Sequence, residues 1–118
     1  MARVIHFEIP ISDPERAAQF YRKVFDWKIE KWAGPLEYWM VTTGKDGPGI
    51  DGGLMKRPGP VTNTVGVESL DSAMEAVKNA GGKVVVEKAS IPTVGYFAHC
   101  EDTEGNLFGL MQADANAR

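Results

Sequence analysis

The sequence predicts an α+β protein made of two tandem copies of one strand–helix–strand–strand–strand unit. The segments "GGLMKR" (52–57) and "FGLMQA" (108–113) repeat Gly-Leu-Met at a spacing of 56 residues. Sliding the chain by this spacing also aligns its first strand, helix and post-helix strand with later counterparts, and such self-similarity is typical of internal repeats. Pro58-Gly59-Pro60 stands where a linker belongs. We therefore predict one domain made of modules 1–57 and 60–113, followed by a tail at 114–118 that frays.

The first copy begins with alternating residues. Residues 3–10 read as a strand whose apolar positions face the helix; they are Ile5, Phe7 and Ile9. Ser12 or Asp13 can cap the next segment and Pro14 suits its first turn, which predicts a helix. The apolar stripe of this helix consists of Ala17, Phe20, Tyr21 and Val24. Strands follow over 27–32 and 36–43, then a glycine-rich loop over 44–53 and a short strand from Leu54.

The second copy repeats this order. Residues 61–68 read as a strand, and 70–80 read as a helix that ends at Gly81-Gly82. Its apolar stripe consists of Leu70, Met74 and Val77. Strands are predicted over 83–87, 96–101 and 107–112, with a tight hairpin at "DTEGN" in which Gly105 or Asn106 takes a positive φ.

The composition limits the functional classes. The chain has 118 residues and a formal net charge of −3, which argues against a nucleic-acid partner held by phosphate contacts. Cys100 is the single cysteine, so no intrachain disulfide can form and a reducing compartment is the simpler expectation. The sequence shows no signal peptide and no apolar run as long as a membrane span. We expect a cytoplasmic, soluble protein without a membrane partner.

Three segments carry a family resemblance. They are "HFEIPISDPERAAQFYRKVFDW" (6–27), "VGVESLDSAMEAVKNAGGKVVVE" (65–87) and "GYFAHCEDTEGNLFGLMQ" (95–112). The chain resembles the vicinal oxygen chelate superfamily, which includes glyoxalase I, bleomycin-resistance proteins and extradiol dioxygenases. The resemblance implies two βαβββ modules with curved mixed sheets enclosing a cleft. The modules pair either within the chain or by exchange across a homodimer, and we expect a homodimer.

The resemblance also implies where a metal would bind. Family members take ligands from the first and fourth strands of each module, and the repeat maps these positions to His6, Gly53, Thr62 and Gly109. A divalent metal usually needs three or four His, Asp, Glu or Cys donors. We therefore expect no metal and no cofactor. A rival interpretation pairs "HFE" at 6–8 with "HCE" at 99–101, although such short patterns recur by chance.

Strand alternation then indicates a ligand-binding face. His6 and Glu8 point away from the helix and are the candidate acid–base pair. The candidate ligand-binding residues are Thr62, Thr64, Met55, Met111, Trp39, Tyr96 and His99. This mixed polar and apolar set suits a small, partly apolar organic molecule. Three functions remain open: a metal-independent lyase or isomerase, a binding protein that sequesters its ligand as resistance proteins do, and a metal-dependent lyase or dioxygenase that uses His6.

Overall fold

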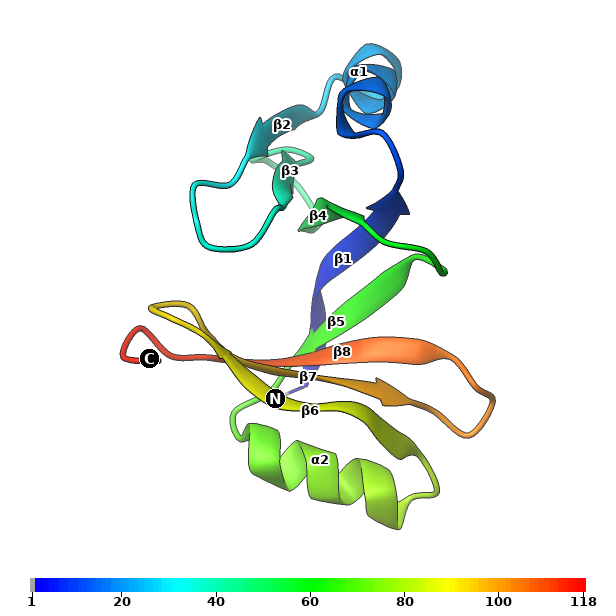
Figure 1. Cartoon of the computed structure of the whole chain (residues 1–118), viewed down its shortest axis with the longest axis vertical. Coiled ribbons are helices and arrows are strands. Elements are labelled where there is room, and N and C mark those ends of the chain that lie inside the picture. The colour runs from blue at the N-terminus through cyan, green and yellow to red at the C-terminus, as the bar shows by residue number, and fades with distance from the viewer. Residues whose placement is uncertain (1) are drawn as a thin grey trace. The chain divides into compact units, whose positions relative to one another are not determined.

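The computed structural model describes residues 2–118 and has the predicted α+β architecture. Within these residues, the order strand–helix–strand–strand–strand occurs twice, which confirms the repeat (Figure 1). The chain divides into two compact units. The first unit is His6–Val61, and the second is Thr62–Arg118 together with the start of the first strand up to Ile5.

The first unit contains one helix and a four-stranded mixed sheet. Its elements are β1 (Arg3–Ile11) from His6 onward, α1 (Pro14–Phe25), β2 (Lys28–Lys31), β3 (Trp39–Thr42) and β4 (Asp51–Lys56). The strand order is β2-β3-β4-β1, with β1 parallel to β4 and the other neighbours antiparallel. The side chain of Asp13 accepts a hydrogen bond from the Arg16 backbone and caps α1, which settles the choice between Ser12 and Asp13.

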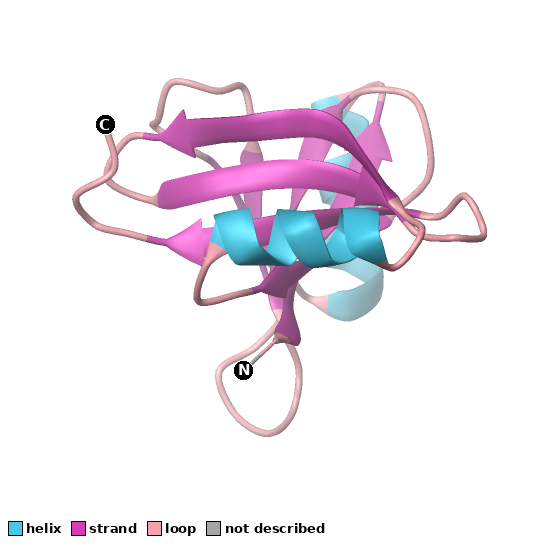
Figure 2. Cartoon of the chain, turned by 90° about the horizontal axis from the view of Figure 1, so that it is seen from below, coloured by secondary structure: helices cyan, strands magenta, loops and turns pink. Residues whose placement is uncertain are grey.

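The second unit repeats this topology. Its elements are β5 (Thr62–Gly66), α2 (Leu70–Asn79), β6 (Lys83–Ile91), β7 (Gly95–Glu101) and β8 (Leu107–Ala113). The strand order is β5-β8-β7-β6, with β5 parallel to β8. Helix α2 lies against one face of this sheet, over β6, β7 and β8 (Figure 2). The hairpin between β7 and β8 has the expected positive φ at Gly105.

The Gly-Leu-Met echo is the fourth strand of each unit, paired in the same register. Gly53 lies opposite Glu8 in the β1–β4 pair, and Gly109 lies opposite Thr64 in the β5–β8 pair. Each member of the second pair is 56 positions after its counterpart in the first. The repeat is therefore a repeat of residue-by-residue pairing and not only of element order.

Each unit has its own core, between its helix and its sheet. Leu54 is fully buried in the first core and Leu110 is 4% exposed in the second, so both leucines face a helix as predicted. The predicted stripe of α2 is also confirmed, since Leu70 and Met74 are buried. Alternation then directs Met55 and Met111 away from the helices.

The predicted apolar stripe of α1 is partly wrong. Ala18 is buried, and Ala17 and Tyr21 pack against the core, but Phe20 and Val24 are 57% and 54% exposed. The part of α1 that contacts the core is therefore narrower than the apolar stripe predicted from the sequence.

Several predicted boundaries also change: β3 is shorter than predicted, at Trp39–Thr42, and β6 is longer, extending to Ile91. Strand β4 begins at Asp51 and not at Leu54, so the last glycines of the predicted loop, Gly52 and Gly53, lie inside a strand. The expected frayed tail is instead held in place. The backbone NH of Thr93 donates to the Ala117 carbonyl, and Ala117 is only 4% exposed. None of the helices formed by residues 2–118 is long and apolar enough to span a membrane.

Candidate functional site

His6 and Tyr38 form a hydrogen-bonded pair on the face of the first sheet that points away from α1. Strand β1 carries His6, and Tyr38 directly precedes β3. The His6 Nε2 atom and the Tyr38 hydroxyl oxygen are 2.6 Å apart, and the pair is partly buried. The distance is short for a nitrogen–oxygen hydrogen bond, which indicates a well-formed interaction.

Gly53 provides the space for this pair. A Cβ atom placed on Gly53 would lie 2.0 Å from the Tyr38 hydroxyl oxygen and 2.1 Å from the ring carbon that carries it. Any side chain at position 53 would therefore displace the phenol. The Tyr38 hydroxyl fills the volume above Gly53 and brings its own hydrogen-bonding group there.

Glu8 is committed to Arg57 and not to His6. The Arg57 Nε atom donates to Glu8 Oε1 at 2.7 Å, and the two side chains are 22% and 16% exposed. The sequence analysis treated Glu8 and His6 as one acid–base pair. Glu8 lies two residues further along β1 and pairs with the guanidinium of Arg57, because alternation puts His6 and Glu8 on one face without bringing their side chains into contact.

Burial sets the protonation of the pair. It lowers the pKa of His6, while the nearby carboxylates of Glu8 and Asp51 oppose this shift. Burial also raises the pKa of the Tyr38 hydroxyl; the Glu8 charge adds to this rise and the Arg57 charge opposes it. Neutral imidazole beside neutral phenol is therefore favoured, and the Tyr38 O–H group can donate to an unprotonated Nε2.

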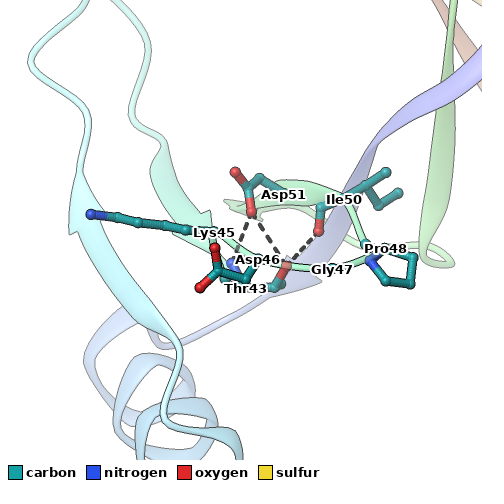
Figure 3. A pocket seen from close by; sticks show the side chains of 9 residues that line it. Thr43, Lys45, Asp46, Gly47, Pro48, Ile50 and Asp51 are labelled. Atoms are coloured by element: carbon teal, nitrogen blue, oxygen red, sulfur yellow. Dashed lines mark hydrogen bonds between the residues drawn. The ribbon is translucent and has the colours of Figure 1, made fainter.

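A structured loop adjoins the pair. Asp51 is the register partner of His6 in the β1–β4 pair. Asp51 Oδ1 accepts hydrogen bonds from the Thr43 backbone NH at 2.9 Å and from Thr43 Oγ1 at 3.3 Å (Figure 3). Thr43 Oγ1 also donates to the Ile50 carbonyl. Residues 43–51 line a cavity of about 170 Å³, which is smaller than the roughly 300–1,000 Å³ of most ligand sites.

The second unit brings three of the candidate residues onto one face. Gly109 pairs with Thr64 on one side and with His99 on the other. Met111 pairs with Phe97, whose ring makes an edge-to-face contact with His99. Cross-strand pairs share a face, so Thr64, Met111 and His99 lie together on the side away from α2. Thr62 opens β5 two residues before Thr64, on the same face by alternation.

Two aromatic candidates are placed differently from the prediction. Trp39 is 9% exposed and belongs to the first core, where it pairs with Leu54. Tyr96 packs against the second core. In both cases the chain neighbour, Tyr38 or Phe97, takes the opposite face. The sequence did not show which of two adjacent aromatic residues faces the core, because both are similarly apolar. For Tyr38, the available signal was Gly53, which has no side chain and leaves room for a ring.

The residues do not fit the metal site that the resemblance implies. Of the four positions, Gly53 and Gly109 have no side chain and Thr62 is a poor donor for transition metals. The imidazole of His6 is engaged by Tyr38, whose hydroxyl fills the volume above Gly53. Among residues 2–118, no group of three or more His, Cys, Asp or Glu side chains is gathered as a metal site requires. The rival combination of His6 and Glu8 with His99 and Glu101 is thus not supported either.

The fold and these two sheet faces define a protein of the glyoxalase-like class whose metal-ligand positions are mostly vacated. The comparison with protein families agrees: the chain belongs to the Glyoxalase/Bleomycin resistance protein/Dioxygenase superfamily, whose model matches residues 3–110. A glyoxylase-like domain-containing protein from Didymella fabae is 32% identical over 112 residues, covering 87% of this chain and 88% of the relative. A putative glyoxylase, CFP32, from Mycobacterium bovis is 36% identical over 73 residues, which are 58% of this chain and 28% of that protein.

Solved structures support the fold at low sequence identity. A hypothetical protein from Bacillus halodurans superposes with a TM-score of 0.74 at 14% identity, covering 99% of this chain and 98% of that one. Methylmalonyl-CoA epimerase from Mycobacterium tuberculosis gives a TM-score of 0.72 at 15% identity, covering 94% of this chain and 87% of the epimerase. At such identities the likeness concerns the fold and not the chemistry.

Proposed function

We propose that this protein binds a small, partly apolar organic molecule without the help of a metal ion, and that His6 and Tyr38 contact the ligand. The observation that carries the proposal is the 2.6 Å hydrogen bond between His6 Nε2 and the Tyr38 hydroxyl. In place of a metal, the site has the Tyr38 oxygen, which can still accept a hydrogen bond, and the His6 imidazole, whose Nδ1–H group can donate one when Nε2 accepts from Tyr38. Such groups recognise a carbonyl, hydroxyl or carboxylate oxygen by hydrogen bonding.

The surroundings support an organic ligand of mixed polarity. Met55 lies on the same face of β4 as Gly53, two residues away, and offers a flexible apolar contact. The Glu8–Arg57 ion pair lies on the same face of β1 as His6 and adds fixed polar groups. Few polar groups set among apolar side chains are typical of small-molecule sites.

A second candidate function is metal-independent acid–base catalysis by an isomerase or a lyase. The lowered pKa of His6 favours this candidate, because a neutral imidazole at pH 7 can accept a proton. The Tyr38 phenol would then stabilise negative charge that develops on a substrate oxygen. Solvent deuterium uptake at the carbon next to a substrate carbonyl would distinguish this candidate from binding alone.

The test of ligand binding is a thermal-shift screen of metabolites in the presence of EDTA, followed by calorimetric titration of the hits. A ligand at 100 times its Kd stabilises the folded protein by about 2.7 kcal/mol, which is easily measured. His6→Ala should weaken binding at least tenfold. The control is Phe20→Ala, because Phe20 is an exposed aromatic residue of α1, on the opposite side of the first sheet from His6.

Two results would contradict the proposal. If the hits bind only after a divalent metal is added, the metal-independent assignment is wrong. If His6→Ala binds every hit as tightly as the unmodified protein does, the ligand does not contact His6.

A further inference from the structure

A second cavity lies at the end of the first sheet, beyond the parallel strands β1 and β4. Its volume is about 470 Å³, and every residue that lines it belongs to the first unit. Ile11 pairs with Lys56 at the last position of the parallel register, so the cavity opens beyond the carboxyl ends of both strands. The cavity is shallow and widely open to solvent, so a bound molecule would be held mainly by the side chains of its wall.

The wall of this cavity is positively charged. Lys56 and Arg57 both line it, and the other described lining residues include no acidic side chain, although each cation also pairs with a glutamate outside the lining, Lys56 with Glu37 and Arg57 with Glu8. Arg57 is held in place, since its Nε atom donates to Glu8 and its Nη1 atom donates to the Pro58 carbonyl. An arginine with a fixed orientation recognises an anion at a smaller entropic cost than a mobile one.

Lys56 is the adaptable charge. Its Nζ atom lies 3.9 Å from Glu37 Oε1, and the two side chains are 51% and 56% exposed. An exposed ion pair at this distance contributes little and exchanges readily with another anion. Lys56 can therefore turn from Glu37 to a bound anion without a large loss of stability.

The remaining lining residues are an alcohol and a set of apolar side chains. Ser12 Oγ accepts a hydrogen bond from Arg16, which orients the hydroxyl group and leaves its proton for donation. Pro10, Ile11 and Pro58 form the apolar part of the wall. A molecule with one anionic group and a short apolar body matches this surface.

We propose that this cavity binds the anionic group, a carboxylate or a phosphate, of a small organic molecule, with Lys56 and Arg57 as its charged contacts and Ser12 as a hydrogen-bond donor. This inference adds an anion-binding part to the proposed ligand site. It rests on the proposed function only for the claim that the rest of the ligand lies near His6. From Pro10 back to His6, β1 covers about 13 Å at roughly 3.3 Å per residue. An organic anion of ordinary metabolite size held in the cavity can therefore extend along β1 toward His6.

The test uses three probes of similar shape: benzoate, phenyl phosphate and the uncharged benzyl alcohol. Each is titrated into the full chain at low ionic strength, where screening is weak, and backbone amide resonances are followed by NMR. Benzoate or phenyl phosphate should shift the amides of residues 11–12 and 56–57, and comparison of the two shows which anion is preferred. Benzyl alcohol should bind at least fivefold more weakly than the better anion.

Lys56→Gln should weaken anion binding by about fivefold, the scale of an exposed ion pair. The matched control is Lys28→Gln, because Lys28 is an exposed lysine of the same unit that also pairs with a glutamate, Glu30, at 3.0 Å. The control should leave anion affinity unchanged. Equal loss in both variants, or equal binding of benzyl alcohol and the anions, would overturn the inference.

His6→Ala separates this inference from the proposed function. Anion-induced shifts at residues 11–12 and 56–57 should persist in that variant, whatever the metabolite screen shows. If they disappear, the anion binds at His6 and the cavity is not an independent site, so the inference fails.

Discussion

Gly53→Ala is the most direct test of how the His6–Tyr38 pair is built. The added methyl group would lie 2.0 Å from the Tyr38 hydroxyl oxygen, far inside van der Waals contact. Because that atom is the far end of a side chain, the phenol can swing away, and its hydrogen bond to His6 is then lost. Gly109→Ala is the matched control, since the nearest atoms to a Cβ at this equivalent position all belong to Thr64, with Oγ1 at 3.0 Å and Cβ and Cγ2 at 3.6 Å.

The expected magnitude follows from two opposing effects. Leaving a partly buried imidazole nitrogen without its partner costs about 1–3 kcal/mol. Replacing a strand glycine by alanine recovers about 0.5–1 kcal/mol by restricting the unfolded chain. The free energy of unfolding should therefore fall by up to about 2.5 kcal/mol in Gly53→Ala, whereas Gly109→Ala, which loses no hydrogen bond, should be unchanged or up to about 1 kcal/mol more stable.

Urea denaturation of both variants measures this difference, and a double-mutant cycle identifies its cause. In a Tyr38→Ala background the ring is absent, so adding Gly53→Ala should cost no further stability. Two results would show that Gly53 is not needed to make room for the Tyr38 ring. One is an equal loss of stability in the two glycine variants, and the other is the same loss with and without the Tyr38 ring.

Three further predictions concern charge and burial. Arg57→Met should lower the free energy of unfolding by about 1–3 kcal/mol, because it leaves the partly buried Glu8 without its ion pair. Lys28→Met removes an exposed ion pair and should cost less than about 0.5 kcal/mol. Thermal denaturation of the two variants measures the difference. Because burial lowers the pKa of His6, the unfolded chain binds more protons than the folded chain as pH falls through 6.5. The free energy of unfolding should therefore fall as the pH is lowered below 6.5, and it should fall less in His6→Gln. Cys100 is fully buried and burial raises the pKa of its thiol, so a thiol reagent should label it only as fast as the protein opens; rapid labelling under native conditions would contradict the structure.

Much of the fold was predictable because its signals are local. The helix α1 is capped by Asp13 within four residues of sequence, and the alternation of β1 reports its buried face directly. The internal repeat added long-range information, since Gly-Leu-Met occurring twice implied two equivalent fourth strands. The equivalence of the two fourth strands was predicted correctly from this spacing, and the outward faces of His6 and Glu8 from the alternation of β1.

The candidate site was predictable only in part. Alternation cannot decide between adjacent aromatics of similar polarity, so the sequence favoured Trp39 and Tyr96 where the structure turns Tyr38 and Phe97 to the opposite faces. The sequence also does not show that Arg57 forms an ion pair with Glu8, because the two residues are 49 positions apart. Such contacts depend on which side chains the packed core leaves room for.

By itself the sequence determined the duplicated architecture, the register of its repeat and the loss of donors at the metal-ligand positions, because these depend on residue identity and local periodicity. Only the tertiary structure decided what replaces the missing donor at Gly53. The sequence shows that position 53 has no side chain. Only the folded structure shows that the Tyr38 hydroxyl occupies the space above Gly53 and forms a hydrogen bond with His6. The physical reason is close packing, which leaves no such volume empty in a folded protein.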